Sequence, residues 1–255
     1  MFFSFINLKG GVGKTSTAFQ LASFLHSKHF SVLALDLDPQ ANFSSLARVN
    51  PSDAAFRLLL GDEPVQSLIS KPPHSFHLIP ASFELNAVDE VLLPSDTLYK
   101  RAGELRRRLE GLEGVYDYII ADTPPHLRIL ALNALAASDK VVVPVVPDAF
   151  SSNGLIQLSK VANLVRSKLN PSLKIDGVLI TRYNARTRLS KSMLSIFEEV
   201  AKVLNTKVYE SKIRDSVRLT EANSALLSIF ELDATSGIAQ DYERFFRELI
   251  GGEEE

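Results

Sequence analysis

The chain has 255 residues, of which 45% are hydrophobic and 23% charged, and its formal net charge is −2. That length and apolar content predict one compact domain over residues 1–250. Cysteine is absent, which excludes disulfides, thiolate catalysis and cysteine-ligated zinc or iron–sulfur sites and is typical of a reducing cytosol.

Short apolar, β-branched runs alternate with helical patterns along the chain. The runs predict strands at residues 2–6, 32–35, 76–79, 118–121, 141–146, 178–181 and 206–209. Helices are predicted at residues 18–28, 99–109, 127–137, 155–169, 189–204 and 236–250. This alternation predicts a single-domain α/β fold with a mostly parallel twisted sheet and helices on both faces. The acidic tail, residues 251–255, is expected to be disordered, and no run has the length of a signal peptide or a membrane span.

A glycine-rich segment between the first predicted strand and the first predicted helix predicts a phosphate-binding loop. Its residues are Lys9, Gly10, Gly11, Val12, Gly13, Lys14, Thr15 and Ser16. Glycines allow backbone N–H groups to turn inward around a polyphosphate, and the following helix N-terminus adds partial positive charge. Lys14 would neutralise the β- and γ-phosphates, and the Thr15 hydroxyl would ligate Mg²⁺. A glycine-rich run is often only a tight turn, but Gly-Lys-Thr between a strand and a helix favours the phosphate loop.

Three aspartates follow predicted strands. Asp36 ends the second strand, Asp38 lies two residues further on, and Asp122 ends the fourth. Ligands bind at the carboxyl ends of parallel strands, and carboxylates ligate Mg²⁺ directly or through water. Each aspartate alone could equally be a cap or turn residue. Together with the loop they predict a metal held by Thr15 and Asp122, and a water oriented near the γ-phosphate by Asp38.

Positive charge is concentrated late in the chain. Residues 182–218 carry nine Lys or Arg and four Asp or Glu, a local charge of +5, which leaves −7 for the rest. Such a stretch is most often a solvated surface, although cationic side chains on one face also bind nucleic-acid phosphates. The run Arg106, Arg107 and Arg108 is interpreted as a solvated helix face, and the five histidines show no metal-binding pattern.

Segments 9–15, 36–40, 122–125, 178–183 and 212–222 resemble the ParA family of partition ATPases, within a wider group that includes the Min-system ATPases. The first three look like the deviant Walker A, A′ and B motifs of that P-loop NTPase type, with Leu8 where the strict motif has glycine. The resemblance spans nearly the whole chain. It implies that ATP and Mg²⁺ close a face-to-face homodimer in which Lys9 reaches the partner's phosphates, while Lys14 stays with its own nucleotide. It also implies that Asp38 positions the attacking water and that Asp36 helps to organise the metal.

The resemblance further implies nonspecific binding of double-stranded DNA by the ATP dimer. The residues implied are Arg182, Arg186, Arg188, Lys191, Arg214 and Arg218. The same expectation includes a ParB-like centromere-binding partner and slow hydrolysis that the partner stimulates. It also includes plasmid or chromosome cargo, a cytoplasmic, nucleoid-associated location and the lack of an N-terminal helix-turn-helix domain. Three positions depart from the common pattern: Ser16 replaces a threonine, Ala41 a glycine and Asn223 a proline.

The main alternative is a Min-type or other positioning ATPase that acts on a membrane or a protein scaffold. A membrane-bound form would need an amphipathic, basic C-terminal helix. Here three glutamates end the chain, and an anionic membrane surface would repel them. The apolar residues of segment 236–250 are therefore expected to pack against the sheet. The chain could also be a regulator that binds nucleotide without hydrolysing it, but Asp38 would then have no function.

Overall fold

The structure, a computed structural model, describes residues 1–72, 75–92, 101–112, 114–148 and 151–251. Its centre is a seven-stranded sheet in the order β3-β2-β4-β1-β5-β6-β7, in which every pair of neighbouring strands is parallel. The strands are β1 (Phe2–Phe5), β2 (Val32–Asp36), β3 (His77–Ile79), β4 (Tyr118–Asp122), β5 (Lys140–Val145), β6 (Lys174–Tyr183) and β7 (Lys207–Arg214).

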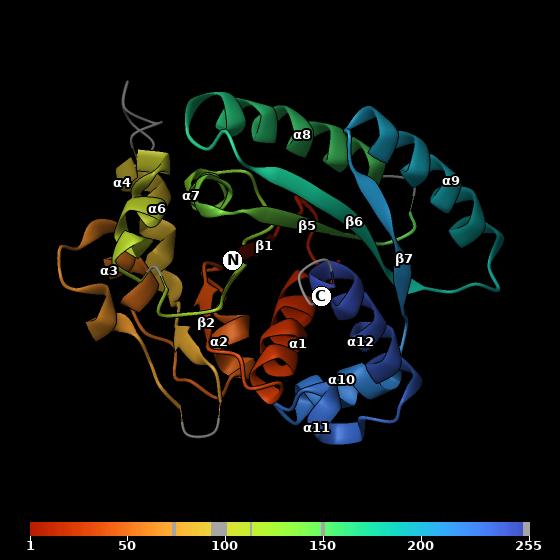
Figure 1. The fold of residues 1–255 in the computed structure, drawn as a ribbon, viewed down its shortest axis with the longest axis horizontal. Coiled ribbons are helices and arrows are strands. Elements are labelled where there is room, and N and C mark those ends of the chain that lie inside the picture. The colour runs from red at the N-terminus through yellow and green to blue at the C-terminus, as the bar shows by residue number, and fades with distance from the viewer. Residues whose placement is uncertain (73–74, 93–100, 113, 149–150, 252–255) are drawn as a thin grey trace.

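Helices cover both faces of this sheet (Figure 1). One face carries α1 (Lys14–Ser27), α2 (Asn42–Leu46), α10 (Val217–Ser224), α11 (Ile229–Asp233) and α12 (Gly237–Ile250). The other carries α3 (Ala54–Leu60), α4 (Ala87–Leu92), α6 (Glu104–Leu109), α7 (Ile129–Ala137), α8 (Ser151–Lys168) and α9 (Arg188–Val203). Short 3₁₀ turns lie at Val65–Leu68, Phe83–Asn86 and Glu110–Leu112. None of the helices described is long and apolar enough to cross a membrane.

The central strands are apolar on both faces because both faces are covered. In β1, Phe2 packs into the core under α3, α7 and α8, whereas Phe3 and Phe5 pack into the core under α1 and α12. Alternate side chains of a strand point to opposite faces, so continuous burial of β1 and β2 requires helices on both sides. The apolar runs that predicted the strands are therefore the direct result of a doubly covered parallel sheet.

All seven predicted strands are confirmed, and the predicted helices correspond to α1, α6, α7, α8, α9 and α12. Residues 99–100 of the predicted 99–109 helix lie outside the described residues, as do residues 252–255 of the expected tail. The helices α2, α3, α4, α10 and α11, each of five to eight residues, were not predicted. β7, an edge strand, extends to Arg214 beyond the predicted 206–209 run, and its added residues are mostly polar and at least partly exposed, apart from the buried Ile213.

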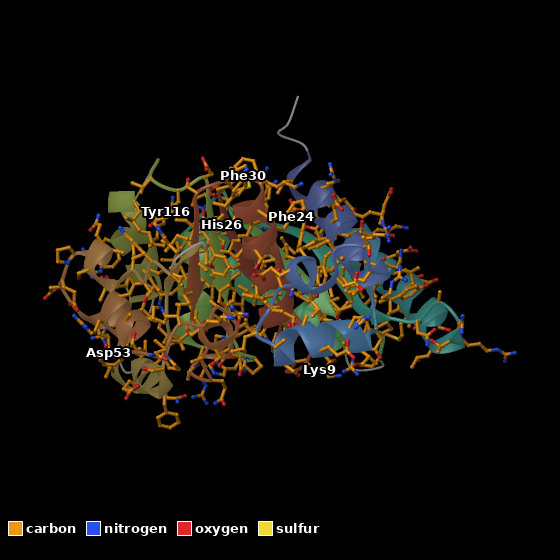
Figure 2. The ribbon with its side chains drawn as sticks, turned by 90° about the horizontal axis from the view of Figure 1, so that it is seen from below. Lys9, Phe24, His26, Phe30, Asp53 and Tyr116 are labelled. Carbon is orange, nitrogen blue, oxygen red and sulfur yellow. The ribbon has the colours of Figure 1, made fainter. Side chains whose placement is uncertain are left out.

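The carboxyl ends of the strands meet at one end of the molecule. Lys9, which follows β1, lies at the opposite end from Phe30 and Tyr116, which precede β2 and β4 (Figure 2). Strand pairing places Asp122 opposite both Asp36 of β2 and Phe5 of β1. The loop after β1 and two of the predicted carboxylates therefore share one edge of the sheet.

Candidate nucleotide site

The loop between β1 and α1 has the backbone of a phosphate cradle. Gly11 has φ 73° and Gly13 has φ 86°, values in the left-handed region that favours glycine. The Gly13 carbonyl accepts from Thr17 N at 2.9 Å, which starts α1 directly after the loop. The N-terminal N–H groups of this helix carry the partial positive charge that attracts a phosphate.

Side chains from distant segments hold this loop in place. Asn7 donates to the Pro144 carbonyl at 2.6 Å and accepts from Lys9 N at 3.0 Å. The Thr181 hydroxyl lies 2.9 Å from the Val12 carbonyl and 3.0 Å from that of Val145. Sequence reasoning missed Asn7 and Thr181 as site residues. The signal available for both was a polar residue at the end of a buried apolar strand.

Asp122 has the environment expected of a metal ligand. It is fully buried, and neither carboxylate oxygen accepts a hydrogen bond of normal geometry from the described residues, although the Thr15 hydroxyl is close enough to lower its pKa. Burial raises its pKa well above the usual value, the neighbouring Asp36 adds to this, and Thr15 and Lys14 oppose it. A buried carboxylate with free oxygens beside the Thr15 hydroxyl fits Mg²⁺, which also keeps waters and nucleotide oxygens as ligands.

Unlike Asp122, Asp36 accepts hydrogen bonds with both carboxylate oxygens. One oxygen accepts from Ser44 N at 2.8 Å and from Ser44 Oγ at 2.7 Å, and the other accepts from Asp38 N at 3.2 Å. Burial raises its pKa to about 6, against these hydrogen bonds. Asp36 thus fastens the start of α2 to the end of β2, and its role at the metal stays a prediction.

The two loop lysines have different surroundings. Lys14 is buried, its Nζ donates to the Lys9 carbonyl at 3.2 Å, and burial lowers its pKa against the attraction of Asp122 and Asp38. The Lys9 ammonium instead pairs with Asp148, and 46% of its side chain is exposed. Lys14 can therefore serve its own loop, whereas Lys9 is turned to the surface.

These groups surround a pocket of about 580 Å³. Of the residues predicted to bind nucleotide, Gly10, Gly11, Gly13, Lys14, Thr15 and Ser16 line it, together with Asp38. Val12 is buried and Lys9 lies outside the lining. Asp38 is 8% exposed and accepts from Gln40 N at 3.0 Å, which fixes its carboxylate at the pocket wall. Ile213, Leu219 and Tyr242 supply apolar surface on which a nucleoside could lie.

The predicted DNA-binding residues fall into two groups. Arg182 and Arg214 line the nucleotide pocket and pair with carboxylates, Arg182 with Asp215 at 3.4 Å and Arg214 with the buried Asp241. Arg218 pairs with Glu221 at 3.0 Å and with Asp233 at 3.8 Å.

Arg186 and Arg188 are exposed, in the β6–α9 loop and at the start of α9, and show no ion pair among the described contacts. The side chain of Lys191 lies outside the described part of the chain. The basic stretch is therefore partly neutralised from within the molecule.

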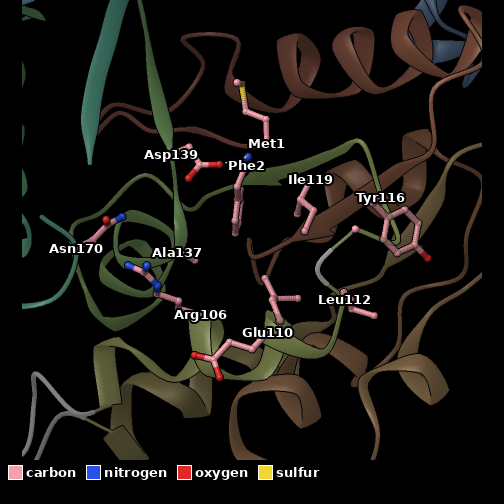
Figure 3. Close-up of a pocket in the computed structure, with 12 residues that line it drawn as sticks. Met1, Phe2, Arg106, Glu110, Leu112, Tyr116, Ile119, Ala137, Asp139 and Asn170 are labelled. Carbon is pink, nitrogen blue, oxygen red and sulfur yellow. Dashed lines mark hydrogen bonds between the residues drawn. The ribbon is translucent and has the colours of Figure 1, made fainter. Parts of the chain in front are cut away.

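A second pocket of about 530 Å³ lies at the opposite edge of the sheet, near Phe2, Tyr116 and Asp139 (Figure 3). Asp139 accepts from Phe2 N at 2.8 Å, and Asn170 donates to the Ser138 carbonyl at 2.7 Å. These polar side chains thus hold the backbone at the start of β1 and between α7 and β5. The described residues also contain no cluster of three or more histidine or acidic side chains placed to hold a metal.

Comparison with known proteins decides the family. A family model described as an AAA domain matches residues 2–175. Over 248 residues the chain is 36% identical to the chromosome partitioning protein ParA of Myxococcus xanthus, covering 96% of this chain and 86% of that protein. It is 38% identical over 240 residues to the sporulation initiation inhibitor protein Soj of Bacillus subtilis, covering 92% of each. The chain belongs to the ParA/Soj family.

Membership of the ParA/Soj family makes the chain a partition-type P-loop ATPase. A solved structure of cobyrinic acid a,c-diamide synthase from Mycobacterium smegmatis, with bound ATP analogue and magnesium, is 29% identical with a TM-score of 0.78. That comparison covers 98% of this chain and 93% of the other. Related ATPases of the same fold thus bind nucleotide and Mg²⁺, and the Thr15, Asp122 and Lys14 arrangement in this chain fits both ligands.

Proposed function

We propose that this chain is an ATP-driven partition switch: MgATP closes a homodimer, and the dimer binds double-stranded DNA without sequence preference. With a ParB-like partner it would position plasmid or chromosome cargo on the nucleoid. Hydrolysis would be slow alone and faster with the partner. Lys14 holds the nucleotide phosphates, Thr15 and Asp122 hold Mg²⁺, and Asp38 orients the attacking water.

The position of Lys9 carries the proposal. Its ammonium is paired with Asp148 at the surface and does not line its own pocket, although it belongs to the phosphate loop. In this position the ammonium points away from its own pocket and is open to the phosphates of a second molecule that meets this face. A nucleotide-closed dimer gives Lys9 such a target.

Exposed cations near the same edge support the DNA interface. Arg186 and Arg188 stand in the β6–α9 region, and 59% of the Arg218 side chain is exposed at the start of α10. Binding that relies on phosphate neutralisation needs cationic side chains and no base-reading motif.

The C-terminal helix argues against a membrane-bound switch. The apolar face of α12 is buried, with Tyr242, Phe245, Phe246 and Leu249 each no more than 3% exposed. These side chains pack with α1 and the sheet, as the sequence predicted. That face has no apolar area left for a lipid surface.

Two lysine variants test the switch. Lys14→Ala should abolish binding of a fluorescent ATP analogue, because the phosphates lose their buried counter-charge. Lys9→Ala should keep that binding but stay monomeric with MgATP in light scattering, and it should lose ATP-dependent binding of random-sequence duplex DNA. A Lys9→Ala protein that dimerises like the parent contradicts the cross-protomer role. Equal DNA affinity of the parent with ATP and with ADP would refute the switch and reopen the scaffold alternative.

A further inference from the structure

Asn223 of α10 contacts the phosphate loop from 207 residues away in the sequence. Its Nδ2 donates to Ser16 Oγ at 3.2 Å, and both residues line the nucleotide pocket. The other end of the amide, Oδ1, is buried and has no hydrogen-bond partner among the described residues. Asn223 is thus tied to the site through Ser16.

A serine hydroxyl has one proton and two acceptor lone pairs. When the Asn223 amide occupies a lone pair of Ser16 Oγ, the hydroxyl proton must point elsewhere. No acceptor for that proton is found among the described residues, and Ser16 borders the pocket directly after Thr15. The acceptors that would enter the pocket beside the helix N-terminus are phosphate oxygens.

We propose that Asn223 is a positioning residue that orients the Ser16 hydroxyl so that it donates to a phosphate oxygen of the bound nucleotide. The inference rests on the proposed nucleotide site but not on DNA binding or dimerisation. It gives a task to Asn223, one of the three departures from the common family pattern. A purely structural Asn223 would only pack α10 against α1.

A double-mutant cycle separates these two roles. The proteins are the parent, Asn223→Ala, Ser16→Ala and the double variant, titrated with fluorescent ATP and ADP analogues in Mg²⁺. Loss of one neutral hydrogen bond predicts that Asn223→Ala weakens both nucleotides by about threefold to tenfold. The double variant should bind like Ser16→Ala, because Asn223 acts through that hydroxyl. Losses that simply multiply in the double variant would overturn the proposal.

Asn223→Asp supplies a test with the opposite sign. Aspartate has almost the shape of asparagine, so a packing role predicts a milder effect than alanine. In the proposed role the carboxylate accepts the Ser16 proton, turns it away from the nucleotide and adds negative charge. Asn223→Asp should then bind nucleotide more weakly than Asn223→Ala and raise KM more than it lowers kcat. The reverse order of affinity would contradict the inference.

Ser224→Ala is the matched control, since Ser224 is exposed on the same helix and should bind nucleotide like the parent. Failure of the parent to bind DNA would refute the proposed switch without changing this nucleotide cycle. Conversely, a cycle with independent losses would remove the role of Asn223 and leave the DNA result intact. The two proposals therefore fail separately.

Discussion

Two buried carboxylates lie side by side at the end of the sheet, and they are stabilised differently. Asp36 accepts three hydrogen bonds from Ser44 and Asp38, whereas the oxygens of Asp122 accept none from the described residues. Burial without compensation is unfavourable for a charged group unless a cation balances it. Asp122 therefore has the environment that a Mg²⁺ ligand requires, whereas Asp36 anchors α2 to the end of β2.

The raised pKa of Asp36 predicts a specific pH dependence of stability. Its pKa rises from 3.8 to about 6 on folding, so between these values the folded state keeps a proton that the unfolded chain has released. The contribution of Asp36 to the free energy of unfolding therefore falls as pH rises from about 4 to about 6. Relative to the parent, Asp36→Asn should gain stability across this window in metal-free urea unfolding.

Asp117→Asn is the control with the opposite sign. Hydrogen bonds from Ser31 lower the Asp117 pKa, so the parent should gain stability relative to that variant as pH rises from acid. If the difference in the free energy of unfolding between the parent and Asp36→Asn does not change between pH 4 and 7, the raised pKa of Asp36 is wrong.

Ala41 holds a conformation suited to glycine. It precedes α2 with φ 52° and ψ 32°, in the left-handed region. A Cβ is unfavourable there by about 1–2 kcal/mol, and the entropy of a glycine in the unfolded chain offsets about half of the gain. Ala41→Gly should therefore raise the free energy of unfolding by about 0.5–1 kcal/mol in urea denaturation.

Ala162→Gly in the middle of α8 should do the reverse and lose about 1 kcal/mol, because its backbone is helical. A destabilised Ala41→Gly protein would show that the Ala41 methyl, which is buried in the structure, outweighs the backbone strain.

At the scale of elements, the end of β6 sets the shape of the phosphate loop. The Thr181 hydroxyl bridges the carbonyls of Val12 and Val145, so it connects β6 both to the loop and to the end of β5. The same two strands pair in parallel up to Val145 opposite Ile180. The Thr181 side chain therefore joins the loop to the sheet, as Asn7 does through the Pro144 carbonyl.

Thr181→Val keeps the side-chain shape but removes the donor. The Val12 and Val145 carbonyls would lose the single hydroxyl proton that they share, so the free energy of unfolding should fall by about 1–2 kcal/mol and nucleotide affinity should also fall. Thr187→Val removes the N-cap of α9, in which Thr187 Oγ1 accepts from Ser190 N, and should lose about 1 kcal/mol without changing nucleotide affinity. Urea unfolding and titration of a fluorescent ATP analogue measure both effects. Unchanged affinity in Thr181→Val would show that the loop holds its shape alone.

At the scale of the whole molecule, internal ion pairs neutralise part of the basic stretch, residues 182–218. Arg182, Arg214 and Arg218 each pair with a carboxylate of this chain, whereas Arg186 has no such partner among the described contacts. A cation that is already paired releases fewer counterions when it meets a phosphate. Arg186 should therefore contribute more than Arg218 to the salt dependence of DNA binding.

This difference is measurable in duplex titrations with MgATP at several salt concentrations. Arg186→Ala, lost twice per dimer, should flatten the log–log salt slope by about 2 units, since each neutralised phosphate contributes about 0.9. Arg218→Ala should flatten it less. Arg107→Ala, which removes a surface ion pair with Glu104 on α6, should leave the slope unchanged. If the arginine variants bind DNA like the parent, the basic stretch is a solvated surface and not a DNA-binding site.

The sequence by itself determined the seven strands, the helices α1, α6, α7, α8, α9 and α12 and the phosphate loop, because each is encoded in residues that are neighbours along the chain. Apolar runs follow from a sheet covered on both faces, and Gly11 and Gly13 stand where the backbone needs positive φ.

Only the tertiary structure brought Thr181 and Asn223 to the loop, and paired Lys9 with Asp148 and Arg214 with Asp241. Each of these contacts is made by a single polar side chain, and the residues in contact are 27 to 207 positions apart in the sequence. The partner that each of these side chains meets follows from strand order and helix packing, which local periodicity does not specify.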